Sequence, residues 1–75
     1  GVAEVIEFNA GRNAKMVGKK IKDIELPENS LILLITRGGA NFIPSGDSLI
    51  QDNDTVLIIV SKNSIEKIDE LFTRE

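Results

Sequence analysis

Residues 30–60 read SLILLITRGGANFIPSGDSLIQDNDTVLIIV, and this stretch decides the fold. Two runs of five apolar residues lie near its ends, LILLI at 31–35 and VLIIV at 56–60. Short apolar runs bounded by turn residues are typical of buried strands, which we expect over 30–36 and 55–60. Neither run alternates apolar with polar residues, as a sheet with one solvated face would require. Both faces of these strands are therefore expected to be covered.

Turn-forming residues separate the two strands. RGGA at 37–40 predicts a tight hairpin, because a Gly supplies the positive φ that such a turn needs. NFI at 41–43 predicts a short return strand, which the following Pro keeps from continuing as a central strand. PSGD at 44–47 and QDND at 51–54 predict two turns. Between these turns, the Leu-Ile pair at 49–50 is expected to pack into the core.

Before this stretch, Val, Ile and Phe residues predict a strand over 2–8. Val17, Ile21 and Ile24 then follow at i, i+4 and i+7, which predicts a short amphipathic helix within 16–24. The chain ends with a second predicted helix, capped by Asn63 with Glu66 in capping-box position. Four apolar residues share one face of that helix: Ile65, Ile68, Leu71 and Phe72.

The element order β-α-β-β-β-α predicts an α+β fold with a mostly antiparallel sheet and two helices on one face. Two short helices cannot cover both faces of that sheet. The remaining apolar side chains must meet loops of the same chain or a second copy, and the latter is the simpler arrangement. The sequence therefore predicts a homodimer.

Composition excludes several classes of function. The 75 residues suffice for one domain, and they include neither Cys nor His, which excludes disulfides, thiolate catalysis and the usual zinc sites. A net charge of −3 and only three aromatic residues give no support to nucleic-acid binding. No apolar run approaches the roughly 20 residues of a transmembrane helix. Since the only Met is Met16, we expect a fragment of a longer protein.

Charged residues form three candidate sites. Asp47, Asp52 and Asp54 belong either to Asx turns or to a cation site, although the ligand pattern of a calcium loop is missing. The basic run 12–22 either forms the solvated face of the first predicted helix or attracts an anion to the N-terminus of that helix. Arg37 either turns the hairpin or clamps a phosphate. In the first case, Arg37→Ala should alter stability by about 0.5 kcal/mol or less. No carboxylate has an apolar setting in sequence that promises a shifted pKa, and no catalytic activity is expected.

Motifs in order along the chain carry a family resemblance. They are VGKKIKDI at 17–24, LILLIT at 31–36, RGG at 37–39, IPSGDS at 43–48 and QDNDTVL at 51–57. Together they resemble the C-terminal RCK domain, also called TrkA-C, over nearly the whole chain. The Asn of QDND replaces the usual Gly, and Asn tolerates positive φ better than most residues, so the turn should persist.

The resemblance implies that residues 1–75 form a single cytoplasmic regulatory domain of a prokaryotic ion channel or transporter, tied to the membrane through the full-length protein. Such domains dimerise and accompany potassium uptake systems and other transporters, and several bind cyclic di-AMP at the dimer two-fold. No resident cofactor, metal or nucleic-acid partner is implied. The alternatives are a structural dimerisation module without a ligand and, disfavoured by charge, a small RNA-binding domain.

A ligand at the two-fold should lie against strand 30–36, its hairpin and segment 41–45. A cyclic dinucleotide needs apolar walls for its bases and donors for its phosphates. The expected walls are Ile35, Phe42, Ile43 and Pro44, and the expected donors are Arg37 and the Asn41 amide.

Overall fold

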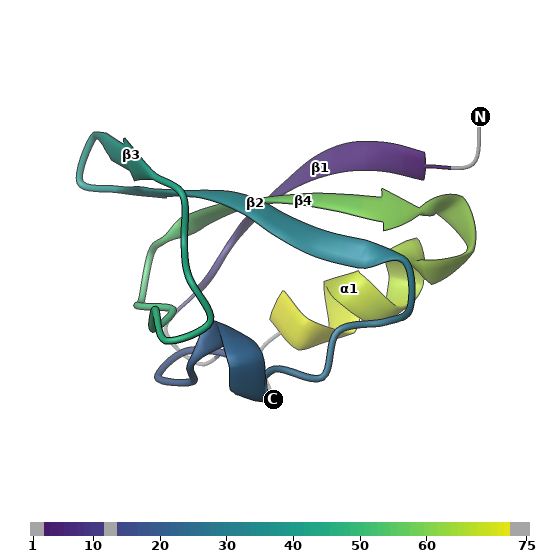
Figure 1. The fold of residues 1–75 in the computed structure, drawn as a ribbon, viewed down its shortest axis with the longest axis horizontal. Helices are drawn as coiled ribbons and strands as arrows, with labels where there is room; N and C mark the ends of the chain where they lie inside the picture. The colour runs from purple at the N-terminus through teal and green to yellow at the C-terminus, as the bar shows by residue number, and fades with distance from the viewer. Residues whose placement is uncertain (1–2, 12–13, 73–75) are drawn as a thin grey trace.

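Four antiparallel strands form one sheet in the order β1-β4-β2-β3 (Figure 1). The computed structural model describes residues 3–11 and 14–72, with Phe72 described only in its backbone. Its elements are β1 (Ala3–Asn9), η1 (Ile21–Asp23), β2 (Ser30–Arg37), β3 (Ala40–Phe42), β4 (Thr55–Ser61), η2 (Lys62–Ser64) and α1 (Ile65–Phe72). The expected α+β class and antiparallel sheet are confirmed.

β4 is a central strand, paired with β1 on one side and β2 on the other. Val56, Ile58 and Val60 alternate along β4 and are fully buried on one face, which we call the inner face. Leu57 and Ile59 alternate with them on the opposite, outer face and are half-buried. Ile68 of α1 belongs to the same buried cluster as the inner-face residues, so the helix covers that face (Figure 1).

A β-bulge in β2 lets two isoleucines three positions apart share the inner face. Ile32 pairs with Ile58, but the next pair is Leu34 with Leu57, which leaves Leu33 as the extra residue. Ile35 is therefore buried beside Ile32 even though strict alternation would place it on the outer face.

The helix expected within 16–24 is not formed, and this expectation was wrong. Gly18 has a φ of 87°, which ends any helical run there. Three of the amides that a helix would use bond to the 46–50 segment instead: Gly18 N–H donates to Ile50 O at 2.8 Å, Ile21 N–H to Ser48 O at 2.8 Å and Lys22 N–H to Gly46 O at 2.9 Å. Only the 3₁₀ turn η1 remains, so one helix and one loop segment, rather than two helices, cover the inner face.

Several local expectations can be compared with the structure. The hairpin turns through Gly38 and Gly39 with φ of 57° and 81°, and Asn53 has a φ of 68°, which confirms both turns. Ile50 is fully buried as expected, but Leu49 is 45% exposed and does not enter the core. Of the pair expected to pack into the core, only Ile50 does so.

Three further expectations concern the chain's other segments. Asn63 lies inside η2 rather than at the start of α1, so the expected cap is wrong. Ile65, Ile68 and Leu71 do pack into the core. Three parts of these expectations lie outside the described residues. They are Val2, at the start of the strand expected over 2–8, Arg12, at the start of the basic run, and the side chain of Phe72.

The outer face carries apolar side chains that no described helix covers (Figure 1). Val5 and Leu31, both paired with Ile59, are 56% and 59% exposed. Leu34 and Leu57 continue this row toward the hairpin. Among the described helices, none is long and apolar enough to span a membrane. The outer face is the surface that a second chain would have to cover.

Candidate functional site

The six residues expected to bind a ligand gather at the hairpin end of β2, on the edge strand β3 and in the loop that follows it. Strand pairing divides them between two faces. Phe42 pairs with Ile35 on the inner side, whereas Asn41 pairs with Thr36 on the outer side. Arg37 pairs with Ala40 and returns to the inner side. The six therefore surround the β3 edge rather than share one surface.

Exposure separates these residues further. Ile35 is fully buried in the core and leaves no surface for a ligand, so it can only support the site from beneath. Phe42 is half-buried against the core, and Pro44 is also half-buried. Ile43 is 82% exposed, the largest value among the exposed large hydrophobic residues, and Asn41 is exposed as well. The accessible part of the expected site is therefore the 41–44 segment together with Arg37.

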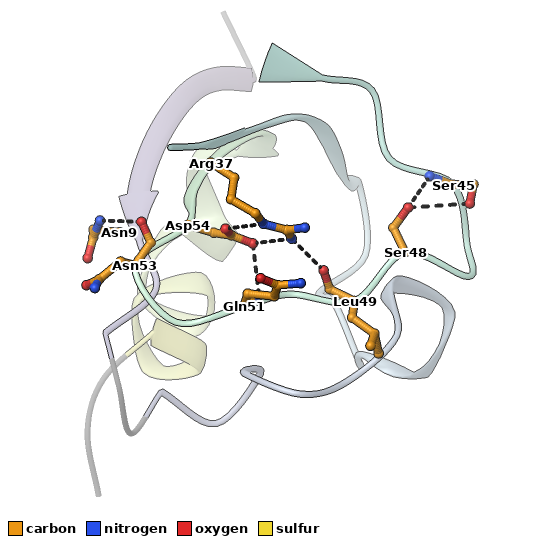
Figure 2. Close-up of polar contacts among 8 residues, drawn as sticks. All are labelled: Asn9, Arg37, Ser45, Ser48, Leu49, Gln51, Asn53 and Asp54. Carbon is orange, nitrogen blue, oxygen red and sulfur yellow. Dashed lines mark hydrogen bonds and ion pairs between the residues drawn. The ribbon is translucent and has the colours of Figure 1, made fainter. Parts of the chain in front are cut away.

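Arg37 is bound by a buried carboxylate that sequence reasoning placed in a turn. Its Nε donates to Asp54 Oδ1 at 2.8 Å and its Nη2 to Asp54 Oδ2 at 2.8 Å, a bidentate pair (Figure 2). The Asp54 side chain is fully buried, while that of Arg37 is 34% exposed. Nη2 also donates to the carbonyl of Leu49 at 2.9 Å. The guanidinium thus links the hairpin to the loop that leads into β4.

Two opposing effects determine the pKa of Asp54. Burial by itself would raise this pKa. The hydrogen bonds from Arg37 and from the Gln51 N–H, at 2.9 Å, together with the charge of Arg37, outweigh burial and lower the pKa below its usual value. The hydrogen bonding between Arg37 and Asp54 also raises the pKa of Arg37. Both groups are charged at neutral pH.

These contacts correct two expectations. Asp54 is fully buried and has a shifted pKa, whereas the sequence led us to expect no carboxylate in a setting that shifts its pKa. Arg37 is more than a turn residue, so Arg37→Ala would leave a buried carboxylate without its main partner. The signal lies in strand register: because Thr36 pairs with Thr55, Arg37 and Asp54 continue past the ends of the β2–β4 ladder toward each other.

Asp47, another member of the acidic cluster, has a different partner. Asp47 forms an exposed ion pair with Lys22 at 2.9 Å. Asp52 lies in the turn before Asp54. Within residues 3–11 and 14–72, no group of three or more potential ligands could hold a metal ion.

Two contacts orient the residues around the β3 edge. The Arg37 guanidinium carbon lies 5.1 Å from the centre of the Phe42 ring, a cation–π distance. Thr36 Oγ1 donates to Asn41 Oδ1 at 2.6 Å, which fixes the Asn41 carboxamide by its oxygen. The Asn41 Nδ2 donors remain directed away from this bond and have no partner among the described residues.

Two hollows lie away from these residues. Their volumes are about 280 Å³ and 390 Å³, and both are lined by Lys15, Glu25 and Leu71. They lie between the 15–27 segment and α1, and none of the six expected ligand residues lines either one. The basic run therefore borders a separate surface. Its described part, residues 14–22, forms no α-helix, so the alternative of an anion held at a helix N-terminus loses its basis.

Comparison with known proteins gives a consistent result. A family model described as the TrkA-C domain matches residues 5–73. A Trk system potassium uptake protein TrkA homolog of Archaeoglobus fulgidus is 43% identical over 61 residues, which is 81% of this chain and 14% of that protein. TrkA homolog 1 of Methanosarcina mazei is 30% identical over 70 residues, or 93% of this chain and 16% of that protein. The chain thus spans about one seventh of the length of these relatives.

Solved structures share the fold. A structure described as "Structure of RCK domain with cda" superposes with a TM-score of 0.81 at 14% identity, covering 92% of this chain and 97% of that chain. The RCK C domain of the potassium transport protein KtrA, in complex with cyclic diadenosine monophosphate, gives a TM-score of 0.76 at 22% identity. It covers 91% of this chain and 81% of its own.

Proposed function

The chain belongs to the TrkA-C domain family, and from this premise we propose that it is a ligand-sensing regulatory domain of a potassium or other ion transporter or channel. The observation that carries this proposal is the family match over residues 5–73, combined with similarity to TrkA homologues. The role is regulatory rather than catalytic. It would be exercised on the cytoplasmic side, through a longer protein that contains this domain or associates with it at the membrane.

The domain acts as a homodimer in this proposal, with the outer face of the sheet and the β3 edge as the contact, because the six expected ligand residues surround that edge. Val5 and Leu31 flank Ile59 of β4 there, one on each side, and each is more than half exposed. Complete burial of a fully exposed side chain of this kind is worth roughly 1.5–3 kcal/mol, and these two, a little more than half exposed, would each gain about half of that on association. A second copy supplies the same apolar row by symmetry, as an isologous interface requires.

The proposed ligand is a cyclic dinucleotide, cyclic di-AMP, bound at the dimer two-fold against β2, its hairpin and the 41–45 segment. A two-fold ligand fits a site made of two identical halves. Ile43 and Pro44 offer apolar surface for a base, with Phe42 behind them. Asn41 Nδ2 and Arg37 offer donors for phosphate oxygens. The KtrA domain of the same fold, which was solved with this ligand, supports the choice of ligand to test.

One observation favours the alternative of a structural dimerisation module without a ligand. Most of the hydrogen bonding of Arg37 is directed inward, to Asp54 and to the Leu49 carbonyl. A residue held in this way contributes to folding whether or not a ligand binds.

Calorimetric titration of the 75-residue chain separates the two readings. We expect cyclic di-AMP to bind with one molecule per two chains, and AMP and ATP to bind far more weakly. Light scattering in the micromolar range should give twice the monomer mass of 8.2 kDa. A dimer that gives no heat with cyclic di-AMP would support the structural module, and a monomer at these concentrations would contradict both readings.

A further inference from the structure

Arg37 keeps part of its hydrogen-bonding capacity unused. A guanidinium carries five N–H donors. Three of these donors are used. The Nε–H and one of the two Nη2–H groups donate to Asp54, and the second Nη2–H group donates to the Leu49 carbonyl. No described residue accepts a hydrogen bond from Nη1. In Figure 2 this nitrogen points away from Asp54, on the side of the segment that carries Ser45 and Ser48.

The direction of Nη1 is set from within the protein. Asp54 is fully buried and grips two guanidinium nitrogens at 2.8 Å, so it fixes the plane as well as the position of the group. The Phe42 ring supports the same group 5.1 Å from its centre. An arginine without such partners samples many rotamers, and a ligand would have to order it on binding. Here that ordering is complete before any ligand arrives.

We propose that Asp54 is the positioning residue of the ligand site: it holds Arg37 with Nη1 unbonded and turned to the side of the 45–48 segment, ready to donate to an oxygen of a phosphodiester. This inference rests on the proposed function, since it specifies how the same site recognises its ligand. Asp54 itself touches no ligand. It acts through the guanidinium.

The pair also determines which phosphates are accepted. Asp54 neutralises most of the charge of Arg37, so recognition depends on directed N–H donors rather than on a strong positive field. The chain as a whole is acidic, with a net charge of −3, and Asp47 and Asp52 lie in the neighbouring turns. A phosphodiester carries one negative charge, whereas a terminal phosphate carries close to two. The site should therefore favour the cyclic dinucleotide over the linear, 5′-phosphorylated diadenylate pApA.

Asp54→Asn tests this role by calorimetry with cyclic di-AMP and pApA. The substitution preserves shape but removes one of the two acceptors and the charge. We expect cyclic di-AMP to bind at least about tenfold more weakly, because a charge-assisted hydrogen bond is lost, and the preference over pApA to shrink. Ile68→Val is the matched control, since it weakens the buried core at α1, far from the hairpin, and should leave both affinities and their ratio unchanged (Figure 1).

Arg37→Lys gives a second measurement if Asp54→Asn does not fold. Lysine keeps the charge and a partner for Asp54 but cannot present a fixed outward donor, so binding should again fall about tenfold or more. In the unaltered chain, titration should shift the Arg37 Nη1 resonance while the Nε–H stays bonded to Asp54. Equal binding by Asp54→Asn and the unaltered chain, or loss of the Nε–H bond on titration, would overturn this inference alone. No binding by the unaltered chain would overturn the proposed ligand as well.

Discussion

Replacing Arg37 by Ala should destabilise the fold by about 2–3 kcal/mol. Removing one partner of a fully buried ion pair typically costs 3–5 kcal/mol. Arg37 is 34% exposed, so water would replace part of the lost contact and reduce that cost. Asp54 would keep only the Gln51 N–H as a bonded partner among the contacts described above. A chain of 75 residues has a total stability of roughly 4–11 kcal/mol, so the loss would be a large share of it.

Urea unfolding followed by circular dichroism at pH 7 measures this loss. A double-mutant cycle with Asp54→Ala then isolates the pair. We expect the double variant to be at least about 1 kcal/mol more stable than the sum of the single effects implies, because it no longer buries an unpaired charge. The reasoning from the buried pair would be refuted if the free energy of unfolding of Arg37→Ala lay within about 0.5 kcal/mol of that of the unaltered chain, or if the coupling energy were near zero. Arg37 would then be a surface turn residue.

Three other predictions follow from the same structure. The pKa of Asp54 is lower in the folded chain than its unfolded value of about 3.9. Between these two pKa values the folded state therefore binds fewer protons than the unfolded state. The stabilising contribution of Asp54 should therefore be complete above about pH 5 and be lost as the pH falls through the folded pKa, and acid unfolding of Asp54→Asn should lack this component. Leu31→Glu on the outer face should convert the proposed dimer into a folded monomer in light scattering, whereas Lys19→Glu, at the hollow beside α1, should not; an intact dimer would place the interface elsewhere. Gly18→Ala should cost about 1–2 kcal/mol, since its φ is 87° although a Cβ would meet nothing within 4 Å. Gly11→Ala is the control, because a Cβ at Gly11 also meets nothing within 4 Å and Gly11 has no positive φ. If the two variants were equally stable, the strain expected at position 18 would be contradicted.

The strands and turns could be predicted because their signals are local. The two apolar runs, the glycines of the hairpin and the Asn that replaces a Gly each act within a few residues of themselves. The Val17–Ile24 spacing failed for the opposite reason. Three of its amides, those of Gly18, Ile21 and Lys22, find partners in the 46–50 segment, 24 to 32 positions away in the chain, and no local periodicity records that pairing.

The candidate site shows the same limit. The sequence places Ile35, Arg37 and Phe42 close together along the chain, and this proximity is confirmed. Which of them a ligand can reach depends on the β2–β3 register and on the bulge at Leu33, which turn Ile35 into the core. The Arg37–Asp54 pair depends on the register between β2 and β4. Only the assembled sheet brings the two residues together.

A buried ion pair needs a reason beyond stability, because apolar residues of similar volume often stabilise a core equally well. What an apolar pair cannot supply is direction. Arg37 is the last residue of β2, and Asp54 stands immediately before β4, the neighbouring strand in the sheet. Their bidentate bond therefore joins the end of β2 to the start of β4 in a single geometry. The Leu49 carbonyl extends that tie to the loop after the 41–44 segment. A ligand oxygen that bonds to Arg37 would therefore act on the hairpin, on this loop and on the entry to the central strand at the same time. Since β4 also carries Leu57 and Ile59 on the outer face, the strand that Asp54 leads into is also part of the proposed dimer contact.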